Sequence, residues 1–489
     1  MQHPSSIETD VVVVGSGASG LSAALSAAES GARALVLEAG ARPGGTSNFP
    51  GGLLAVESCV QRAAGIHITK ADVFERMMEF NHYRGDAPLV WTIIDRSAAT
   101  IDWLQAHGVE FLGALSMAKG SLPTWHLIKG AGAALVKALL ARCRERATPI
   151  LLKSPAIRLL RDGGRIAGVV ACVEGRETEI RARAVVLASG GYASNAEWMK
   201  DYTGYDVQRT IWPAVNVYLG GDSQRMAWDA GAAKDGLGLL EIEFEFNGPG
   251  STGNQLRNVV RQPYLWVNDR GERLGNEDRL CSIPNYGGNV LTRQARKQAF
   301  LIFDAQTRRR METQGYARRG GPPFLDPRPQ LVDFDAQLDD AVSAGNPNIF
   351  RADSVDALAR ACGIDHAGLV DTLQAYNRLA DDGADSQFGK DNAVLDPVRN
   401  GPFYALRITP IMLGTLGGLK VDARLRVLDE TDAPIAGLYA VGNIASGMYG
   451  DTYCIVFPGT TLAFAVNSGR IAGEHAARLT APTTACAAR

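Results

Sequence analysis

The sequence has few of the features that mark a metal centre, a disulfide scaffold or a polyanion-binding protein. Its seven cysteines are scattered, with no C-x-x-C pair and no C-x-x-C-H haem motif, and its seven histidines show no metal-ligand spacing. We therefore expect reduced thiols and no protein-bound metal. The formal net charge is only −2, which excludes a general electrostatic attraction to nucleic acid or to an anionic membrane.

Long apolar runs are missing as well. No stretch reaches the roughly 20 apolar residues that a transmembrane helix needs, and the opening M-Q-H-P-S-S-I-E-T-D has neither an apolar segment nor twin arginines. These absences predict a cytoplasmic protein without a membrane span. Glycine, in contrast, is plentiful: 54 of 489 residues are typical of a chain with tight turns and close backbone approaches to a ligand.

The first glycine motif lies between residues 10 and 52. Val11–Val14 is a short β-branched run that predicts a buried parallel strand. A small-residue helix is expected over Ala18–Ala28 and a second strand over Ala34–Leu37, with the acidic Glu38 at its end. Between the first strand and the helix stands the pattern G-x-G-x-x-G, formed by Gly15, Gly17 and Gly20.

Each part of this motif has a physical role in dinucleotide binding. Gly15 allows the tight turn, Gly17 lets the backbone approach a pyrophosphate, and Gly20 lets the helix pack closely on the strand. The helix N-terminus attracts the phosphates, and Glu38 is placed to accept hydrogen bonds from a ribose. The motif predicts a dinucleotide site but does not separate FAD from NAD.

The rest of the chain predicts an α/β protein with an insertion. Strands are expected between residues 150 and 187, where the run ends in A-S-G-G-Y. The character changes near residue 204, and α/β patterning returns near residue 399. We therefore expect a discontinuous domain over 1–203 and 399–480, an inserted domain over 204–398 and a flexible tail over 481–489. Within the insertion, Ser354 and Asp365 are predicted N-caps of two helices.

Several motifs, taken together, resemble one flavoprotein family. They are G-S-G-A-S-G-L, E-A-G-A-R-P-G-G-T-S, L-A-S-G-G-Y, G-D-S-Q-R-M-A-W-D-A-G-A, T-L-G-G-L-K-V-D and G-L-Y-A-V-G-N. The family contains fumarate reductases, succinate dehydrogenase flavoprotein subunits and 3-ketosteroid dehydrogenases, and the motifs are nearest to the last of these. The resemblance implies a discontinuous Rossmann-type FAD-binding domain with an inserted α+β capping domain, and addition or removal of hydrogen across a C–C bond.

The resemblance also implies how FAD is held. The G-G-T-S-N turn contains no histidine for a covalent link, so we expect non-covalent FAD, and without a haem or FMN-attachment motif the electron donor or acceptor is external. The cofactor-binding residues implied are Gly15, Gly17, Ala18, Gly20, Glu38, Ala39, Gly44, Gly45, Thr46, Gly51, Gly52, Ala156, Gly190, Gly191, Gly442, Asn443, Thr460, Thr461 and Leu462.

Two stretches distinguish the branches of this family. Fumarate reductases carry H-H-T before their T-x-G-G element, where this chain has Leu413, Gly414 and Thr415. The loop Y-G-D-T-Y-C-I-V-F-P-G-T-T also lacks the arginine of their N-R-L-G-G loop, and an unpaired dianion in a desolvated site is costly. Both stretches resemble 3-ketosteroid dehydrogenases, although Cys454–Val456 make this loop longer than their pattern.

The implied mechanism uses groups of this loop. The Gly459 N–H polarises a carbonyl oxygen, Tyr453 exchanges a proton with the α-carbon, and flavin N5 exchanges a hydride with the β-carbon. Tyr449 competes with Tyr453 for the proton-transfer role. The same groups serve desaturation of a ketone or reduction of the corresponding enone, so the sequence leaves the direction open.

Other interpretations remain open at this stage. Tyr453 is alternatively an ordinary packed loop tyrosine. Arg279 is either an ion-pair partner in the capping domain or a clamp for the carboxylate of an unsaturated acid, as in a fumarate reductase-like enzyme. An electron-transfer flavoprotein subunit is a third possibility. Tyr264 and Tyr286 are either structural or assisting groups. Three more arginines are predicted to be solvated surface charges: Arg257, Arg261 and Arg293.

Overall fold

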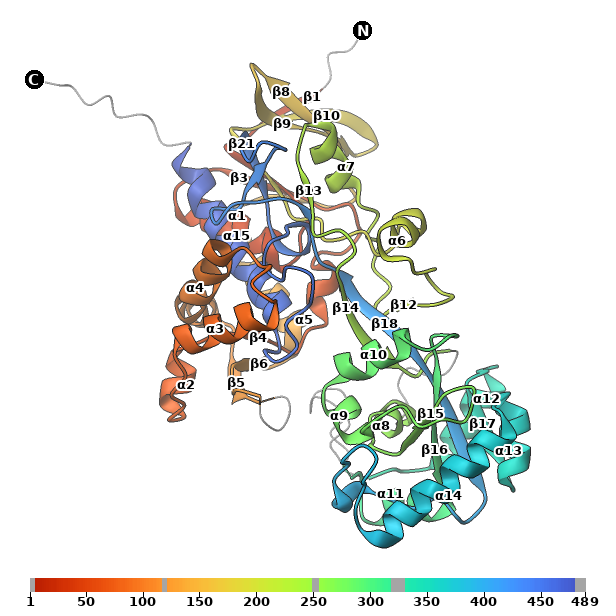
Figure 1. Ribbon diagram of the computed structural model, residues 1–489. Coiled ribbons are helices and arrows are strands. Elements are labelled where there is room, and N and C mark those ends of the chain that lie inside the picture. Colours follow the sequence, from red (N-terminus) through yellow and green to blue (C-terminus); the bar gives the residue numbers. More distant parts are fainter. Residues whose placement is uncertain (1–4, 117–120, 249–254, 318–329, 480–489) are drawn as a thin grey trace, which may run out of the picture. The chain divides into compact units, whose positions relative to one another are not determined.

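The computed structural model describes residues 5–116, 121–248, 255–317 and 330–479, so the predicted tail 481–489 lies outside the described residues. The chain folds into two compact units. Unit 1 contains Met1–Gly204, Val215–Leu240 and Gly414–Arg489, and unit 2 contains Tyr205–Ala214 and Glu241–Leu413. Figure 1 labels the elements of both units along the chain.

Unit 1 is built on a six-stranded sheet with the order β20-β21-β11-β2-β3-β7. All neighbouring pairs are parallel except β20 and β21. Strands β2, β3 and β11 are buried along their whole length, which is why they consist almost entirely of Val, Leu and Ala. The strands are β2 (Val11–Val14), β3 (Ala34–Leu37), β7 (Ile150–Leu151), β11 (Ala184–Leu187), β20 (Arg426–Leu428) and β21 (Pro434–Ala440).

Two helices from opposite ends of the chain pack backbone to backbone in unit 1. They are α1 (Ala18–Glu29) and α15 (Thr460–Arg478), and they lie side by side in Figure 1. A Cβ atom added to Gly469 would lie 2.2 Å from Ser19 O, and one added to Gly473 would lie 2.2 Å from Ala23 O. Glycine is therefore required at both positions for this approach.

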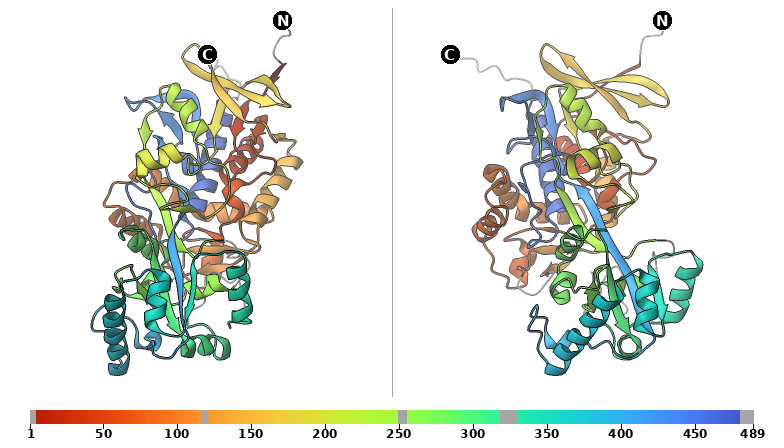
Figure 2. Two further views of the ribbon diagram at one scale, coloured as in Figure 1. Left: turned by 90° about the vertical axis from the view of Figure 1, so that its right-hand side faces the viewer. Right: turned by 45° about the vertical axis from the view of Figure 1, so that its right-hand side comes forward.

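Smaller sheets complete unit 1. The orders are β1-β10-β9-β8, β4-β6-β5 and β13-β19, and Figure 2 shows β8, β9 and β10 of the first, in yellow, as a twisted sheet. Their strands are β1 (Ser5–Glu8), β4 (Gly52–Leu54), β5 (Phe111–Leu115), β6 (Trp125–Ile128), β8 (Ala156–Asp162), β9 (Arg165–Val173), β10 (Arg176–Arg181), β13 (Lys234–Asp235) and β19 (Gly418–Leu419). The further helices are α2 (Cys59–Ala63), α3 (Lys70–Phe80), α4 (Ala87–Ala106), α5 (Ala131–Glu145), α6 (Ala196–Thr203) and α7 (Asp222–Asp229).

Unit 2 is organised around the long strand β18 (Phe403–Thr415), whose neighbours are β12, β14, β16 and β17. The other strands are β12 (Trp212–Pro213), β14 (Leu240–Glu245), β15 (Leu265–Val267), β16 (Ala299–Asp304) and β17 (Ile349–Ala352). The helices are α8 (Leu256–Val260), α9 (Glu277–Ser282), α10 (Pro284–Thr292), α11 (Ala305–Thr313), α12 (Phe334–Ser343), α13 (Val355–Cys362) and α14 (His366–Asp382). The predicted N-caps are confirmed, since Ser354 accepts from Ala357 N and Asp365 accepts from Gly368 N.

The extents of the units differ from the predicted boundaries 204–398. Residues 215–240 belong to unit 1 because they bond to its C-terminal strands: Lys234 pairs with Leu419, and Ala233 N donates to Leu428 O. Unit 2 in turn runs to Leu413 because β18 is continuous through the stretch where we expected the first domain to resume.

A buried ion cluster lies inside unit 2. The Arg273 guanidinium donates to both carboxylate oxygens of Glu277, each at 2.8 Å, and to those of Asp385 at 3.0 and 2.7 Å. Lys390 Nζ lies 3.3 Å from Glu277 and donates to Tyr376 Oη at 2.7 Å. The side chains of Arg273, Glu277, Asp385 and Lys390 are at most 2% exposed. The cluster holds two positive and two negative charges, which compensate one another.

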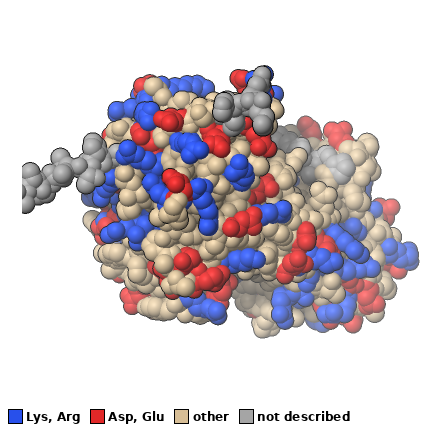
Figure 3. All heavy atoms as spheres, turned by 90° about the horizontal axis from the view of Figure 1, so that it is seen from above, with Lys and Arg blue, Asp and Glu red and all other residues tan. Residues whose placement is uncertain are grey.

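The surface carries mixed charge. On the face shown in Figure 3, basic and acidic side chains are interspersed, as the small net charge leads one to expect. Within the described ranges, no helix combines the length and the apolar character needed to cross a membrane.

Candidate active site

The glycine motif that runs from the end of β2 into the first turn of α1 leaves no space for side chains at two of its positions. Gly15 has φ +109°, and a Cβ atom there would lie 2.5 Å from Ala188 O. A Cβ atom on Gly20 would lie 1.9 Å from Gly15 O. Gly17 differs, because its nearest neighbour would be Ser47 Oγ at 3.4 Å. Gly17 is therefore the position with an open side, where we predict the close approach of a ligand.

Glu38 at the end of β3 is tied to the glycine loop. Its Oε2 accepts from Ser16 N at 3.1 Å and from Ser16 Oγ at 2.5 Å, and its Oε1 accepts from Gly40 N at 2.7 Å. The exposed Ala39 stands between these groups in the chain. Ala156 begins β8 two residues after Ser154, whose N–H donates to Glu38 O at 2.8 Å. The structure thus gathers the residues predicted for the adenosine end.

The turn at Gly44–Thr46 docks on the same loop through two serines. Gly44 N donates to Ser16 O at 3.1 Å and to Ser16 Oγ at 3.2 Å. The predicted contact Ala18 uses its N–H to donate to Ser47 Oγ at 2.9 Å. Sequence reasoning missed Ser16 and Ser47. Both are small polar residues inside or next to glycine motifs, and that position could have indicated their role in holding the two turns together.

Two further glycine elements lie at this edge of the sheet. A Cβ atom on Gly191, which follows β11, would lie 1.9 Å from Thr415 Oγ1. Gly442, which follows β21, has φ +69° and donates its N–H to Ser468 Oγ at 3.0 Å. Its neighbour Asn443 accepts from Gly417 N at 2.9 Å. Both glycines come after the carboxyl ends of parallel strands, the edge where α/β folds bind ligands.

A separate contact joins Gly52 to Gly459, the residue that precedes α15. A Cβ atom on Gly459 would lie 2.8 Å from Gly52 O and 2.8 Å from Leu53 Cα, and Gly459 O accepts from Leu54 N at 3.1 Å. The neighbouring Gly51 accepts from Ile128 N at 2.9 Å. The structure therefore brings Gly459 beside Gly52, although their roles toward a flavin stay predictions.

The N-terminus of α15 has donors to offer a ligand. Its first intrahelical bond runs from Ala463 N to Gly459 O at 3.0 Å, so the N–H groups of Thr460, Thr461 and Leu462 have no partner within the helix. Thr460 is 0% exposed, and its Oγ1 has no hydrogen-bond partner among the described residues. Buried hydroxyl groups are normally hydrogen-bonded, so a ligand is a natural partner for this one. A cofactor with carbonyl and ring-nitrogen acceptors, such as FAD, fits this donor set.

Tyr449 and Tyr453 lie in the loop that leads into α15. Both are buried, and their ring centroids are 5.4 Å apart at an interplanar angle of 52°. Tyr449 also meets Phe464 of α15 edge-on at 6.4 Å. The two candidate proton donors and Gly459 therefore share one buried loop.

The residues predicted in unit 2 differ from this group. Arg279 is exposed on α9. Tyr264 lies in the hydrophobic core of unit 2, where burial raises its pKa, and Tyr286 packs against that core. The environments of the two tyrosines are those of packed residues.

One arginine prediction is wrong. Arg261 is not a solvated charge, because its side chain is only 14% exposed and pairs with Glu243 at 3.3 Å and Glu245 at 3.4 Å. The glutamates stand at alternate positions of β14. The sequence around them did not reveal that they contact Arg257 of α8 and Arg261 just after it. Arg257 also pairs with Glu245, whereas Arg293 is exposed as predicted.

A buried histidine behind Gly52 escaped the sequence reasoning. His126 is 0% exposed, pairs with Leu53 across β4 and β6, and has Nε2 at 2.6 Å from Ser58 Oγ and Nδ1 at 2.9 Å from Thr124 O. Burial lowers its pKa to about 4. At neutral pH it is therefore an uncharged core residue.

This environment predicts a pH-dependent stability. An unfolded histidine binds a proton below about pH 6.5, whereas folded His126 does so only below about pH 4. The free energy of unfolding therefore falls as the pH drops from about 6.5 to 4, by about 3 kcal/mol from this group. Denaturant unfolding of H126N should show a flatter pH profile than wild type, and the exposed His82, replaced as H82N, is the control. An unchanged profile in H126N would contradict this reasoning.

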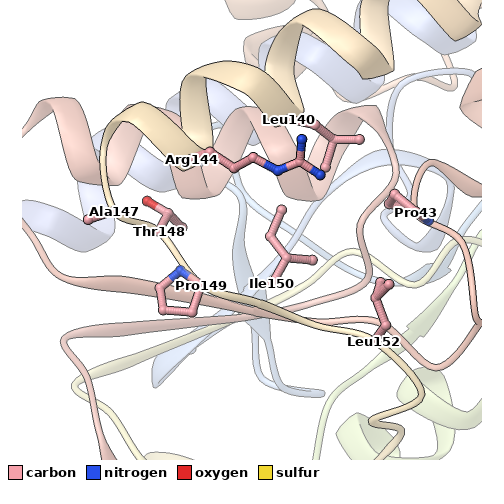
Figure 4. Close-up of a pocket in the computed structure, with 8 residues that line it drawn as sticks. All are labelled: Pro43, Leu140, Arg144, Ala147, Thr148, Pro149, Ile150 and Leu152. Carbon is pink, nitrogen blue, oxygen red and sulfur yellow. The ribbon is translucent and has the colours of Figure 1, made fainter.

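A pocket of about 440 Å³ lies between α5 and β7, with Arg144 reaching across it from α5 (Figure 4). Of its lining residues, only Pro43 adjoins a predicted site residue, Gly44. It contains none of the donors found at α15, so we do not assign the chemistry to it. Within the described parts of the chain there is also no cluster of three His, Cys, Asp or Glu side chains able to hold a metal.

Comparison with known proteins agrees with these features. The family model described as "FAD binding domain" matches residues 10–454. The vinyl phenol reductase of Lactiplantibacillus plantarum is 37% identical over 494 residues, covering 96% of this chain and 97% of that protein. A fumarate reductase (cytochrome) of Shewanella frigidimarina is 27% identical, covering 96% of this chain and 77% of its own length.

Among solved structures, the 3-ketosteroid Δ1-dehydrogenase from Sterolibacterium denitrificans in complex with 1,4-androstadiene-3,17-dione has a TM-score of 0.79 at 23% identity. The alignment covers 96% of this chain and 99% of that one. This likeness confirms the predicted fold class, an α/β FAD-binding fold with an inserted second domain.

Proposed function

We propose that this chain, which belongs to the FAD binding domain family, reduces the C=C bond of a neutral alkene conjugated to a phenol or a carbonyl group. It is an FAD-dependent oxidoreductase acting on CH–CH bonds. The observation that carries the narrower proposal is the 37% identity, over nearly the full length of both chains, to an enzyme named for a vinyl phenol.

The charge of the site region supports a neutral substrate. The loop Tyr449–Thr461 contains no Lys, Arg or His, and Leu413 and Gly414 stand where a dicarboxylate enzyme carries histidines. Arg84 reaches this loop from outside, but it is mostly exposed and is paired with Asp451 at 3.2 Å. A carboxylate brought into the buried part of the loop would lack a charged partner from the loop itself, which is unfavourable in a desolvated site. A phenol or ketone oxygen needs only hydrogen-bond donors.

The chain's own groups then have defined roles. Gly459 N–H donates to no described residue, and we assign it to the substrate oxygen, where negative charge grows during reduction of an enone. Tyr453, with Tyr449 as the competing candidate, delivers a proton to the alkene carbon. The N-terminus of α15 stabilises negative charge near the cofactor. When bound, FAD supplies the hydride.

Several further points belong to the proposal. Unit 1 carries the FAD site and unit 2 the capping role. FAD is held without a covalent bond, because the turn Gly44–Asn48 contains no histidine, and it exchanges electrons with an external donor or acceptor. The cysteines found in the described residues are all unpaired, which supports the reducing cytoplasm as the location.

The function is tested by reoxidation of the anaerobically reduced holoenzyme. We expect 4-vinylphenol or cyclohexenone to restore the absorbance of oxidised flavin, with fumarate and acrylate inactive. Reoxidation by the unsaturated acids alone would instead indicate the carboxylate reductase, with Arg279 as its clamp. Reoxidation by a protein partner but by no alkene would indicate an electron-transfer subunit. Acid precipitation should release the flavin, since no covalent bond holds it.

A further inference from the structure

We propose that Trp125 contacts the substrate: its indole Nε1–H donates a hydrogen bond to the phenol or carbonyl oxygen of the alkene. This inference rests on the proposed function and adds a side-chain donor to the Gly459 N–H. Trp125 is the first residue of β6, and its position follows from the pairing of β6 with β4, in which it faces Leu54.

The indole lies against both glycines of the candidate site. A Cβ atom on Gly52 would lie 2.9 Å from Trp125 Nε1, and one on Gly459 would lie 2.8 Å from Trp125 Cδ1. The pyrrole edge of the ring therefore covers the place where β4 meets the N-terminus of α15. A side chain on either glycine would displace this edge, so the two glycines and the tryptophan form one surface.

The Nε1–H group of Trp125 has no hydrogen-bond partner among the residues that the structure describes. Trp125 is only 8% exposed, yet its indole nitrogen donates to none of the described residues. The Nε1 atom of Trp125 is not fully enclosed by the protein, so it keeps contact with open space. The indole nitrogens of Trp103 and Trp228 have partners, Glu29 Oε2 at 2.9 Å and Gly418 O at 3.0 Å. That of Trp266 is enclosed without a partner in the core of unit 2, so what distinguishes Trp125 is an unpartnered indole nitrogen that borders open space. A buried indole normally finds an acceptor, and the open side of Trp125 leaves that place to a ligand.

The reaction supplies such an acceptor. Reduction adds one hydride and one proton across the C=C bond. In an enone, hydride arrival at the β-carbon moves an electron pair onto the carbonyl oxygen as an enolate. In a vinyl phenol, protonation of the terminal carbon draws an electron pair from the phenol oxygen, and hydride arrival at the carbon next to the ring returns that pair. An N–H donor at the oxygen stabilises the negative charge of the enolate, and toward a phenol, which gains no net charge, it serves as a positioning hydrogen bond.

The test compares ligands with and without the oxygen. Calorimetric titration of the holoenzyme with 4-ethylphenol and with toluene measures the contribution of the hydrogen bond. W125F keeps an aromatic ring but removes the donor, so we expect its Kd for 4-ethylphenol to rise about tenfold and its Kd for toluene to stay the same. W125H, which keeps a ring N–H, should recover part of the affinity, and W91F, at an exposed tryptophan of α4, is the matched control.

The outcomes separate this inference from the function on which it rests. Equal affinity of W125F and wild type for 4-ethylphenol overturns the role of Trp125, while continued reduction of 4-vinylphenol by wild type upholds the function. Loss of FAD from W125F with an unchanged Kd for 4-ethylphenol assigns the indole to the cofactor and also overturns the inference. A wild-type enzyme that neither binds 4-ethylphenol nor reduces 4-vinylphenol refutes both.

Discussion

Replacing Tyr453 by phenylalanine is expected to lower kcat for reduction of 4-vinylphenol by about 10²- to 10⁴-fold, the usual contribution of a positioned general acid. The substitution keeps the ring that packs 5.4 Å from that of Tyr449 and removes only the hydroxyl group. We therefore expect flavin content and melting temperature to remain at wild-type values. Stopped-flow reoxidation of the reduced flavin measures the step directly, without contributions from the electron donor.

Tyr449→Phe is the matched comparison, because Tyr449 lies in the same loop and is equally buried. A large effect in Y453F and a small one in Y449F would assign proton transfer to Tyr453. The reverse pattern would assign it to Tyr449, and near-unchanged rates in both variants would remove the loop tyrosines from the mechanism. A pH profile that loses one limb in the slow variant would identify the missing group as the acid.

Replacing Arg273 by methionine should destabilise unit 2 by about 3–5 kcal/mol, the range found when one member of a buried ion pair is removed. Burial alone would raise the pKa of Asp385, yet the bonds from Arg273 and from backbone N–H groups hold that pKa well below its usual range. Without Arg273, two buried carboxylates would face only Lys390, whose own pKa burial lowers.

Arg270→Met is the control for this prediction, because Arg270 pairs with Glu272 while both side chains are more than half exposed. Such a pair contributes at most about 1 kcal/mol. Differential scanning calorimetry measures the melting temperature of both variants. If R273M and R270M lowered the melting temperature equally, the buried cluster would not be the source of stability that its geometry suggests.

The sequence predicted the elements whose signals are local. The bounds of β2 and β3 were predicted to the residue. A four-residue apolar run between turns is too short for a buried helix, so it indicates a strand. The N-caps Ser354 and Asp365 were also correct, since a cap depends on the three residues that follow it. The family and fold class followed from glycines whose spacing is itself a steric requirement.

The remaining features depend on pairings between distant segments. The residues next to Arg261 in the sequence do not indicate its partners, Glu243 and Glu245, which lie on β14. In the sequence, His126 and Trp125 look like ordinary strand residues. Their position beside the site follows only from the pairing of β4 with β6 and from the contact between Gly459 and Gly52. The motifs of the candidate site could therefore be recognised from the sequence, whereas the residues that pack beside them could not.

The glycine contacts between α1 and α15 also bear on how the protein is made. The helix α1 of the dinucleotide motif packs on α15, which is synthesised more than 400 residues later, and β21 joins the central sheet only after unit 2 has been translated. Until then, the apolar face of α1 is not covered by α15, and one edge of β11 is not paired with β21. Such late closure of long-range contacts slows folding and exposes strand edges to association, so ribosome-bound chains that lack α15 should depend on chaperones.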